Sequence, residues 1–318
     1  MQKHLIQCTL IHLLLLSCGT TRFEGQEPRE IAQGQLELRF LQVIGSPGSG
    51  PGQFLNPQGI SVDPEGSIYV ADTGNDRVQK FDSDGNFVME IGGFGFEEEQ
   101  FNEPRDLCAT VGLDIYVADS QNRRLQRYDR YLNYLSTLVP NPNLDESLQF
   151  GMVSGIDISS SGDMYLSDSE NDRILKIDAF ERPERSFGDI GYGRGLLRAP
   201  TSLSVDQKGT VYVCDSGNDR VATYDIFGEY QGSLGEGVLR APRGIDLDGH
   251  GNVFVADTGN NRIAAFNRAG TVILAFGSMG DGYGSFRSPH DLVVDRHGHL
   301  YVLDTGNGRV QKYSIEFP

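Results

Sequence analysis

Tryptophan is absent from the 318 residues, and only 4 are cysteine. Without tryptophan, the chain lacks the aromatic platform on which sugar rings most often stack. Two cysteines, Cys8 and Cys18, belong to the N-terminal leader. Cys108 and Cys214 fall in non-adjacent units of the repeat described below, so we expect no structural disulfide. Basic residues are outnumbered, with 27 Lys and Arg against 44 Asp and Glu. A formal net charge of -17 repels polyanions, so no nucleic-acid partner is expected.

Long hydrophobic runs are also missing, and the longest apolar stretch, from Leu5 to Leu16, is too short to cross a bilayer. This stretch is typical of a secretory signal peptide. It ends in Leu15-Leu16-Ser17-Cys18, which resembles the cleavage box of bacterial lipoproteins. The alternative is an ordinary secretory signal with an incidental cysteine.

The lipoprotein resemblance implies a signal peptide at 1–17, a lipid on Cys18 and a polar tether at 18–37. It also implies an exported protein that touches the membrane only through its lipid anchor, at the outer membrane where the cell has one. The mass of the mature N-terminal peptide would show whether Cys18 carries the lipid.

One unit repeats six times along the chain. An Asp recurs at intervals of 42 to 49 residues, and an Arg follows five residues after each Asp. The pairs are Asp72 and Arg77, Asp119 and Arg124, Asp168 and Arg173, Asp215 and Arg220, Asp257 and Arg262, and Asp304 and Arg309. A period of this length belongs to solenoids, propellers or arrays.

The pattern inside the unit selects among these architectures. In the first copy, turn clusters at 63–66, 73–76 and 83–86 separate four short apolar-rich runs without helical periodicity. Four short antiparallel strands per unit predict an all-β, six-bladed β-propeller. The sixth unit ends after three strands, and residues 40–45 are similar to the fourth strand of the first unit. The N-terminal strand is therefore expected to close the last blade, in one propeller over 38–318.

The segments that lead into each unit carry a more specific resemblance. Most of these segments are glycine-rich. They end in the pattern apolar-x-x-Pro, as in Phe54-Leu55-Asn56-Pro57. A strand and a V-A-D-T-G-N-x-R motif follow. This arrangement resembles the NHL repeat family and implies its propeller fold. The fold does not by itself imply a function.

The six Asp–Arg pairs occupy equivalent positions in every unit, so their predicted role is structural. The carboxylate can accept backbone amides of the turn and pair with the Arg five residues later. Function is therefore expected where the units differ. The first residue after the Pro position varies among Gln58, Arg105, Ser154, Thr201, Arg243 and His290. The next position contains Asp106 and Asp291.

These variable positions predict a ligand site at one mouth of the central channel, formed by Gln58, Arg105, Asp106, Arg243, His290 and Asp291. Two Arg residues beside carboxylates suit a small anionic or zwitterionic ligand, or an envelope protein that presents such a group. The alternatives are a solvated channel rim or a self-satisfied polar network.

An enzymatic alternative remains open at the same mouth. Phe286 to Asp291 resembles the F-x-x-P-H-D segment of the peptidyl-hydroxyglycine amidating lyase, a family that binds zinc through His residues in three blades. This chain has one such residue, His290, so the full zinc set is missing. We expect no metal site and no cofactor, although a divalent metal at the mouth would favour a lyase or hydrolase. The main prediction is a monomeric, lipid-anchored binding or scaffold module rather than an enzyme.

Overall fold

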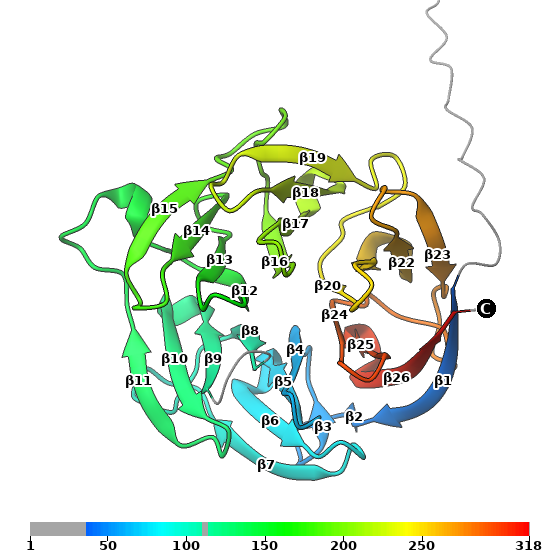
Figure 1. The fold of residues 1–318 in the computed structure, drawn as a ribbon. Helices are drawn as coiled ribbons and strands as arrows, with labels where there is room; N and C mark the ends of the chain where they lie inside the picture. Colours follow the sequence, from blue (N-terminus) through cyan, green and yellow to red (C-terminus); the bar gives the residue numbers. More distant parts are fainter. Residues whose placement is uncertain (1–35, 110–113, 318) are drawn as a thin grey trace, which may run out of the picture. The chain divides into compact units, whose positions relative to one another are not determined.

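The computed structural model describes residues 36–109 and 114–317, which form six four-stranded antiparallel sheets arranged in a ring about a central axis (Figure 1). The expected signal peptide and most of the expected tether lie outside these residues. No helix in the described part of the chain is long and apolar enough to cross a membrane.

Each sheet is one blade, and its strands run in order from the channel to the rim. Blade 1 contains β4 (Gly59–Val62), β5 (Ile68–Asp72), β6 (Arg77–Phe81) and β7 (Phe87–Gly92). Blade 2 contains β8 (Pro104–Cys108), β9 (Asp114–Asp119), β10 (Arg124–Asp129) and β11 (Tyr134–Leu138). Blade 3 contains β12 (Val153–Ile158), β13 (Met164–Asp168), β14 (Arg173–Ile177) and β15 (Pro183–Phe187).

The second half of the ring repeats this order. Blade 4 contains β16 (Pro200–Val205), β17 (Val211–Asp215), β18 (Arg220–Tyr224) and β19 (Tyr230–Leu234). Blade 5 contains β20 (Ile245–Leu247), β21 (Val253–Asp257), β22 (Arg262–Phe266) and β23 (Val272–Phe276). Blade 6 contains β24 (Asp291–Val294), β25 (His299–Asp304), β26 (Arg309–Glu316) and β1 (Glu37–Ile44).

Short elements complete the described part. Strands β2 (Ser46–Pro47) and β3 (Gln53–Phe54) form a parallel pair before blade 1. Single 3₁₀ turns join the second and third strands of five blades: η1 (Thr73–Asn75), η2 (Ser120–Asn122), η4 (Ser216–Asn218), η5 (Thr258–Asn260) and η6 (Thr305–Asn307). A further turn, η3 (Glu146–Leu148), precedes blade 3.

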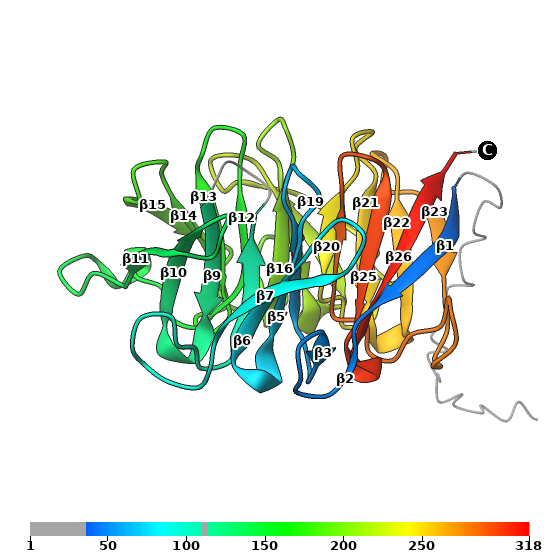
Figure 2. The ribbon, with the colours of Figure 1, turned by 90° about the horizontal axis from the view of Figure 1, so that it is seen from below.

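The propeller has two distinct faces. Connections from the fourth strand of one blade to the first strand of the next, here called the lead-in loops, lie with the 3₁₀ turns at the lower edge of Figure 2. Turns between the first and second strands lie at the upper edge, which is called the turn face. The axis of the ring therefore runs from a lead-in face to a turn face.

The N-terminal strand closes the ring as the sequence predicts. β1 pairs antiparallel with β26, from Glu37 opposite Glu316 to Ile44 opposite Val310. Leu36 is buried in the core between blades 5 and 6, so the fold begins slightly before the expected boundary at 38. Because β1 covers the outer edge of β26, the last blade has the same four strands as the others.

The core lies in the interfaces between adjacent blades. In one such cluster, Tyr69 and Val78 of blade 1 pack against Val117 and Tyr128 of blade 2, and all four are fully buried. These residues alternate with neighbours that face the other side of their sheet, as expected for strands buried on both faces. Each blade is therefore held mainly by its two neighbours.

The repeated Asp residues are fully buried at the ends of the second strands, and each one accepts a hydrogen bond from its Arg. In blade 6, Asp304 Oδ2 lies 2.8 Å from Arg309 Nε, and Oδ1 accepts the backbone N–H of Arg287 at 2.7 Å. The carboxylate thus fastens the lead-in loop to the end of its blade. Asp168 of blade 3 differs, because its Oδ1 has no partner.

Candidate functional site

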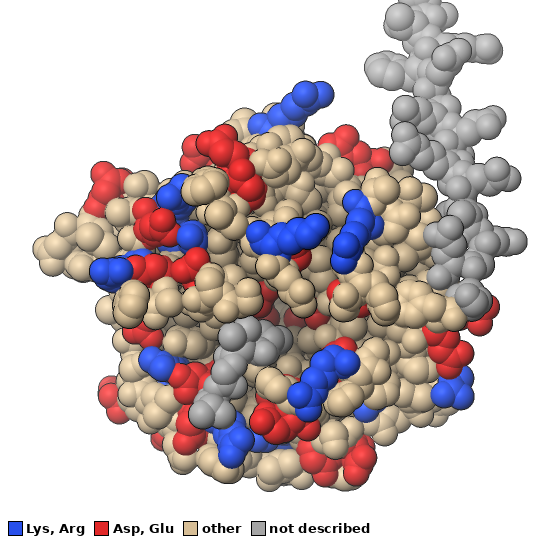
Figure 3. Space-filling view, viewed as in Figure 1, with Lys and Arg blue, Asp and Glu red and all other residues tan. Residues whose placement is uncertain are grey.

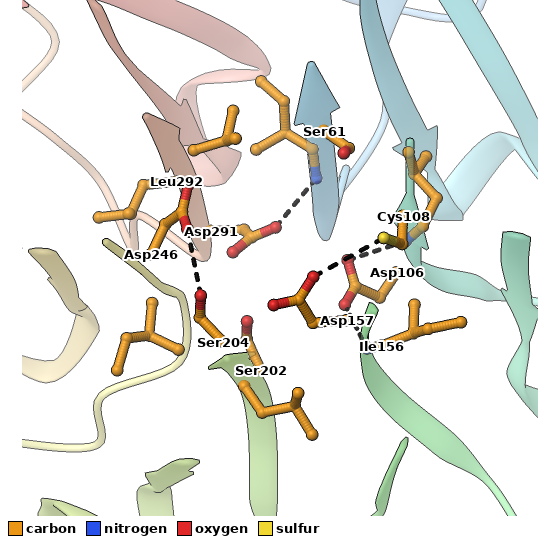
Figure 4. Close-up of a pocket in the computed structure, with 15 residues that line it drawn as sticks. Ser61, Asp106, Cys108, Ile156, Asp157, Ser202, Ser204, Asp246, Asp291 and Leu292 are labelled. Carbon is orange, nitrogen blue, oxygen red and sulfur yellow. Dashed lines mark hydrogen bonds between the residues drawn. The ribbon is translucent and has the colours of Figure 1, made fainter. Parts of the chain in front are cut away.

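The channel wall is made from the first strand of each blade. Such a strand is the inner edge of its sheet, so some of its backbone N–H groups have no partner within the blade. Four buried or half-buried aspartates, the channel carboxylates Asp106, Asp157, Asp246 and Asp291, point into this space (Figure 4).

Each channel carboxylate accepts an N–H from the first strand of the next blade. Asp106 takes the N–H of Ile156 at 2.9 Å, and Asp157 takes that of Val205 at 2.8 Å. The other two bonds are from Val294 to Asp246 at 2.7 Å and from Ile60 to Asp291 at 2.9 Å. The seam between blades 1 and 2 uses a hydroxyl instead, since Ser61 Oγ accepts the N–H of Ala109 at 3.0 Å. The carboxylates therefore join neighbouring blades at the centre of the ring.

Burial raises the pKa of all four carboxyls, because desolvation disfavours the charged form. The pKa of Asp157 rises to about 6 and that of Asp246 to about 7. The pKa of Asp106 lies well above its ordinary value, through burial and then through the nearby Asp291 charge. Asp246 also accepts the Ser204 hydroxyl at 3.2 Å. The cavity open to a water molecule is about 40 Å³, which is room for a few waters.

The raised pKa of Asp246 predicts a pH-dependent effect of Asp246→Asn. Because the folded pKa, about 7, exceeds the unfolded value, the native carboxyl stabilises the fold at low pH and loses that contribution as pH rises toward 8. The asparagine does not titrate. The variant should therefore melt below wild type at pH 5, and the gap should narrow by pH 8.

Thermal melts of both proteins between pH 5 and pH 8 measure this gap. Asp82→Asn is the matched control, because hydrogen bonds from Asn86 lower the pKa of this carboxyl. Both its folded and its unfolded forms stay ionised above pH 5, so its gap should stay constant. A constant gap for Asp246→Asn would contradict the assignment of a raised pKa.

The channel mouth on the lead-in face consists of the residues that begin the inner strands. Here Arg243 Nη1 lies 2.8 Å from His290 Nε2, and His290 Nδ1 lies 3.0 Å from the backbone oxygen of Gln58. A carbonyl accepts only, so Nδ1 carries the proton and Nε2 accepts from the guanidinium. Burial first, and then the Arg243 charge, lower the pKa of His290 to about 3. The imidazole is therefore neutral and fixes the orientation of Arg243.

Arg243 is exposed, and no carboxylate of the described residues forms an ion pair with it. Partial desolvation of the guanidinium first, and then the positive charge of Arg105, lower the pKa of Arg243. Arg105 donates from Nη2 to Glu103 at 3.1 Å, while its buried Nε has no hydrogen-bond partner. Two guanidinium groups thus lie at the mouth with donor capacity left over.

The structure divides the six residues of the predicted site between two places. Arg105, Arg243 and His290 lie at the mouth, and Gln58 contributes its backbone oxygen to His290. Asp106 and Asp291 lie deeper, in the channel, where they bind backbone N–H groups of neighbouring blades. No group of three or more His, Cys, Asp or Glu in residues 36–109 and 114–317 is placed to hold a metal ion.

Sequence reasoning missed Asp157 and Asp246. Both stand at the fourth position after the Pro position, where the other blades have Ser61, Cys108, Ser204 and Val293. Because alternate residues of a strand face the same side, this position points into the channel like that of Asp106. Extending the comparison of blades by two residues would have found them.

A space-filling view shows the surface of the turn face (Figure 3). Its centre is hollowed, and acidic side chains are visible within the hollow (Figure 3). Around it, acidic and basic residues alternate without a large patch of one sign. The channel is therefore acidic inside, whereas the mouth on the opposite face has cationic side chains.

Comparison with known proteins identifies the repeat. The NHL repeat family matches residues 54–81, 101–128, 197–224, 239–266 and 286–313, which covers every blade except blade 3. Protein lin-41 of Caenorhabditis elegans is 48% identical over 50 residues, which is 16% of this chain and 4% of that protein. The chain thus spans a small fraction of that relative's length.

Solved structures resemble the whole propeller. An auxiliary nutrient binding protein from Bacteroides ovatus ATCC 8483 aligns with a TM-score of 0.65 and 16% identity, over 89% of this chain and 78% of the other. A virginiamycin B lyase from Staphylococcus aureus aligns with a TM-score of 0.57 and 13% identity, over 88% of this chain and 99% of the other. At these identities the likeness concerns the fold alone.

Proposed function

Because the chain is a six-bladed β-propeller built from NHL repeats, with cationic side chains at one channel mouth, we propose that it is a binding module. The mouth on the lead-in face holds an anionic or zwitterionic group of a small ligand or of a cell-envelope protein. The module works as an exported monomer, anchored through a lipid on Cys18, with no cofactor. The tether would let the propeller present this face away from the membrane.

One observation carries the proposal: Arg243 is exposed at the mouth, held by the neutral His290, and lacks an acidic partner within the described residues. Arg105 lies close by with an unpaired Nε. A guanidinium offers five donors in a planar fork, which matches a carboxylate or phosphate. A bound anion would accept from the exposed guanidinium of Arg243, and it would offset the repulsion between the two cations.

The contacts of His290 weigh against the alternative, a lyase or hydrolase at this mouth. A general base needs a ring nitrogen that can take a proton from the substrate. In His290, Nδ1 donates to Gln58 and Nε2 accepts from Arg243, so neither nitrogen is available. The histidine acts as a positioning residue for the arginine.

Substitutions at the mouth should weaken ligand binding without unfolding the protein. A thermal-shift screen of mono- and dicarboxylates, amino acids and phosphate first identifies a compound that raises the melting temperature. Arg243→Ala and Arg105→Ala should then each cost about 1.5–3 kcal/mol of binding, or roughly 10- to 100-fold in Kd. Their own melting temperatures should stay near that of wild type.

Arg268→Ala provides the matched control, since Arg268 is an exposed arginine in a turn of blade 5 on the turn face. The Kd of this variant for the same compound should remain within a factor of two of the wild-type Kd. The site assignment is wrong if both mouth variants bind the compound normally, or if the Arg268 variant weakens binding as much as they do.

A further inference from the structure

The lead-in face carries more unpaired arginines than the mouth alone. The second residue before the Pro position is Leu55, Asn102 and Gly151 in blades 1 to 3, but Arg198, Arg240 and Arg287 in blades 4 to 6. We call these three residues the arginine arc. Blades 4, 5 and 6 are consecutive in the ring, so equivalent positions in them follow one another around half of the lead-in face (Figure 1).

The backbone of each arc residue is fixed on both sides. The N–H of Arg240 donates to Asp257 Oδ1 at 2.8 Å, and its carbonyl accepts the N–H of Gly259 at 2.9 Å. Arg198 and Arg287 make the same pair of bonds within their own blades. The anchoring aspartates are the fully buried ones of the repeat, so hydrogen bonds tie the backbone of the arc to the buried end of each second strand.

The side chains lie across the glycine of each 3₁₀ turn. A Cβ added at Gly259 would come within 2.7 Å of Arg240 Cγ, and the same crowding occurs at Gly217 beneath Arg198 and at Gly306 beneath Arg287. Glycine at these turns therefore makes room for the arginine stems. The aliphatic part of each arginine is packed, while the guanidinium is left at the surface.

The three guanidinium groups are exposed, and none makes a side-chain hydrogen bond or an ion pair with any residue in the described ranges. Arg198 lies over the ring of Tyr192, with 4.8 Å from Cζ to the ring centroid. Across the face, in blade 2, Arg123 is paired with Glu170 at 2.6 Å. In a chain of net charge -17, the arc is therefore a localised cationic surface.

Two features of the surroundings indicate the kind of partner. Asp172 and Asp219 lie beside the arc, because they accept the N–H groups of Ala199 and Ala241 at 2.5 and 2.7 Å. The lead-in loops also expose Ile190 and Tyr192 before blade 4, and Met279 and Tyr283 before blade 6. Cations interspersed with carboxylates and flanked by apolar side chains match a polypeptide of mixed composition better than a uniformly charged phosphate polymer.

We propose that the arginine arc binds an acidic segment of a partner polypeptide, whose Asp or Glu carboxylates pair with Arg198, Arg240 and Arg287. The segment runs along blades 4 to 6, and the apolar side chains of the lead-in loops contact its uncharged residues. The arc and the mouth are connected in one way, which rests on the proposed function: a carboxylate at the end of the bound segment can reach Arg243 at the mouth. The arc itself does not depend on the mouth.

A fluorescein-labelled dodecapeptide of glutamate is the probe, and fluorescence anisotropy measures its Kd for the full propeller at low and at physiological salt. The arc variant is the triple Arg198→Gln, Arg240→Gln, Arg287→Gln. The control is the triple Lys208→Gln, Arg268→Gln, Arg296→Gln, which changes exposed cations on the turn face of the same three blades. Both triples remove three positive charges, so they have the same effect on net charge.

The arc triple should raise Kd at least tenfold, and the control triple should change it less than threefold. A dodecamer of glutamine should not bind wild type. Melting temperatures of the single variants Arg198→Gln and Arg287→Gln show whether the fold is retained, and each single variant should raise Kd about threefold. Equal loss in the arc and control triples would overturn the proposal, as would the absence of saturable glutamate binding.

Two further arms separate the alternatives. If an oligothymidylate or inorganic polyphosphate binds the arc more tightly than the glutamate peptide, the partner is a phosphate polymer and the peptide assignment is wrong. Arg243→Gln distinguishes the arc from the mouth. If the arc triple no longer binds the peptide while Arg243→Gln still binds it, peptide binding by the arc is supported. This holds even if the small-ligand screen finds no compound for the mouth. If only Arg243→Gln no longer binds the peptide, carboxylates bind at the mouth and the arc proposal is wrong.

Discussion

Replacing Asp304 with alanine should lower the free energy of unfolding by about 3–5 kcal/mol, because it leaves a partly buried guanidinium without its carboxylate. Asp304 is fully buried and accepts from Arg309 at 2.8 Å, from Asn307 at 2.9 Å and from Gln311 at 3.1 Å. It also binds the N–H of Arg287 at the start of the lead-in loop. One substitution therefore removes the acceptor for four donors.

Asp168→Ala is the matched comparison within the same chain. The pair in blade 3 is looser, with 3.3 Å between Arg173 Nε and Asp168 Oδ2, and Asp168 Oδ1 has no partner. Its loss should therefore cost less, about 1–3 kcal/mol. Denaturant unfolding of both variants gives the two values. The structural role assigned to these pairs fails if Asp304→Ala is within 1 kcal/mol of wild type, and the comparison fails if the two variants lose equal stability.

Deleting residues 36–45 should prevent cooperative folding or cause aggregation. The deletion removes β1, including the buried Leu36 and Ile44, and leaves β26 as an unpaired edge along the side of the propeller. Burying each large apolar side chain contributes about 1.5–3 kcal/mol. Together with the lost ladder of hydrogen bonds, this is comparable to the whole stability of many domains, about 5–15 kcal/mol. The exposed edge would then pair with other chains.

Size-exclusion chromatography and thermal unfolding of chains that begin at residue 36 and at residue 46 make this comparison. Both lack residues 1–35, so any difference between them is due to residues 36–45, which contain β1. A chain starting at residue 46 that remains monomeric and melts within a few degrees of the longer one would show that the N-terminal strand is dispensable for closing the ring.

Most of the fold could be predicted from the sequence because its features are local and repeated. Turn clusters such as Asp63-Pro64-Glu65-Gly66 separate short apolar-rich strands, and six copies of the unit make the pattern clear. Closure by β1 followed from counting strands. The residue at which the propeller begins could not be predicted by counting strands. It depends on Leu36, which is buried by blades 5 and 6, and these blades come far later in the chain.

The candidate site was only partly predictable. The positions that vary among blades identified Arg105, Arg243 and His290, but not the different depths of the residues in the channel. Asp106 and Asp291 follow the arginine and histidine directly in the sequence, yet strand alternation turns them inward to bind backbone N–H groups of the next blade. The neutral state of His290 depends on burial and on Arg243, which lies 47 residues away in the chain.

Binding of an anionic group by Arg243 and Arg105 at the lead-in mouth can be observed directly by NMR of the arginine side chains. Protein labelled with ¹⁵N-arginine is titrated with malonate, and the Nε–Hε signals are assigned by single substitutions. The Arg243 and Arg105 signals should show saturable shifts, whereas the signals of the half-buried Arg262 and Arg309 should stay unchanged. Shifts confined to Arg268 and Arg296 on the turn face, or no saturable shift at the mouth, would contradict binding at this mouth.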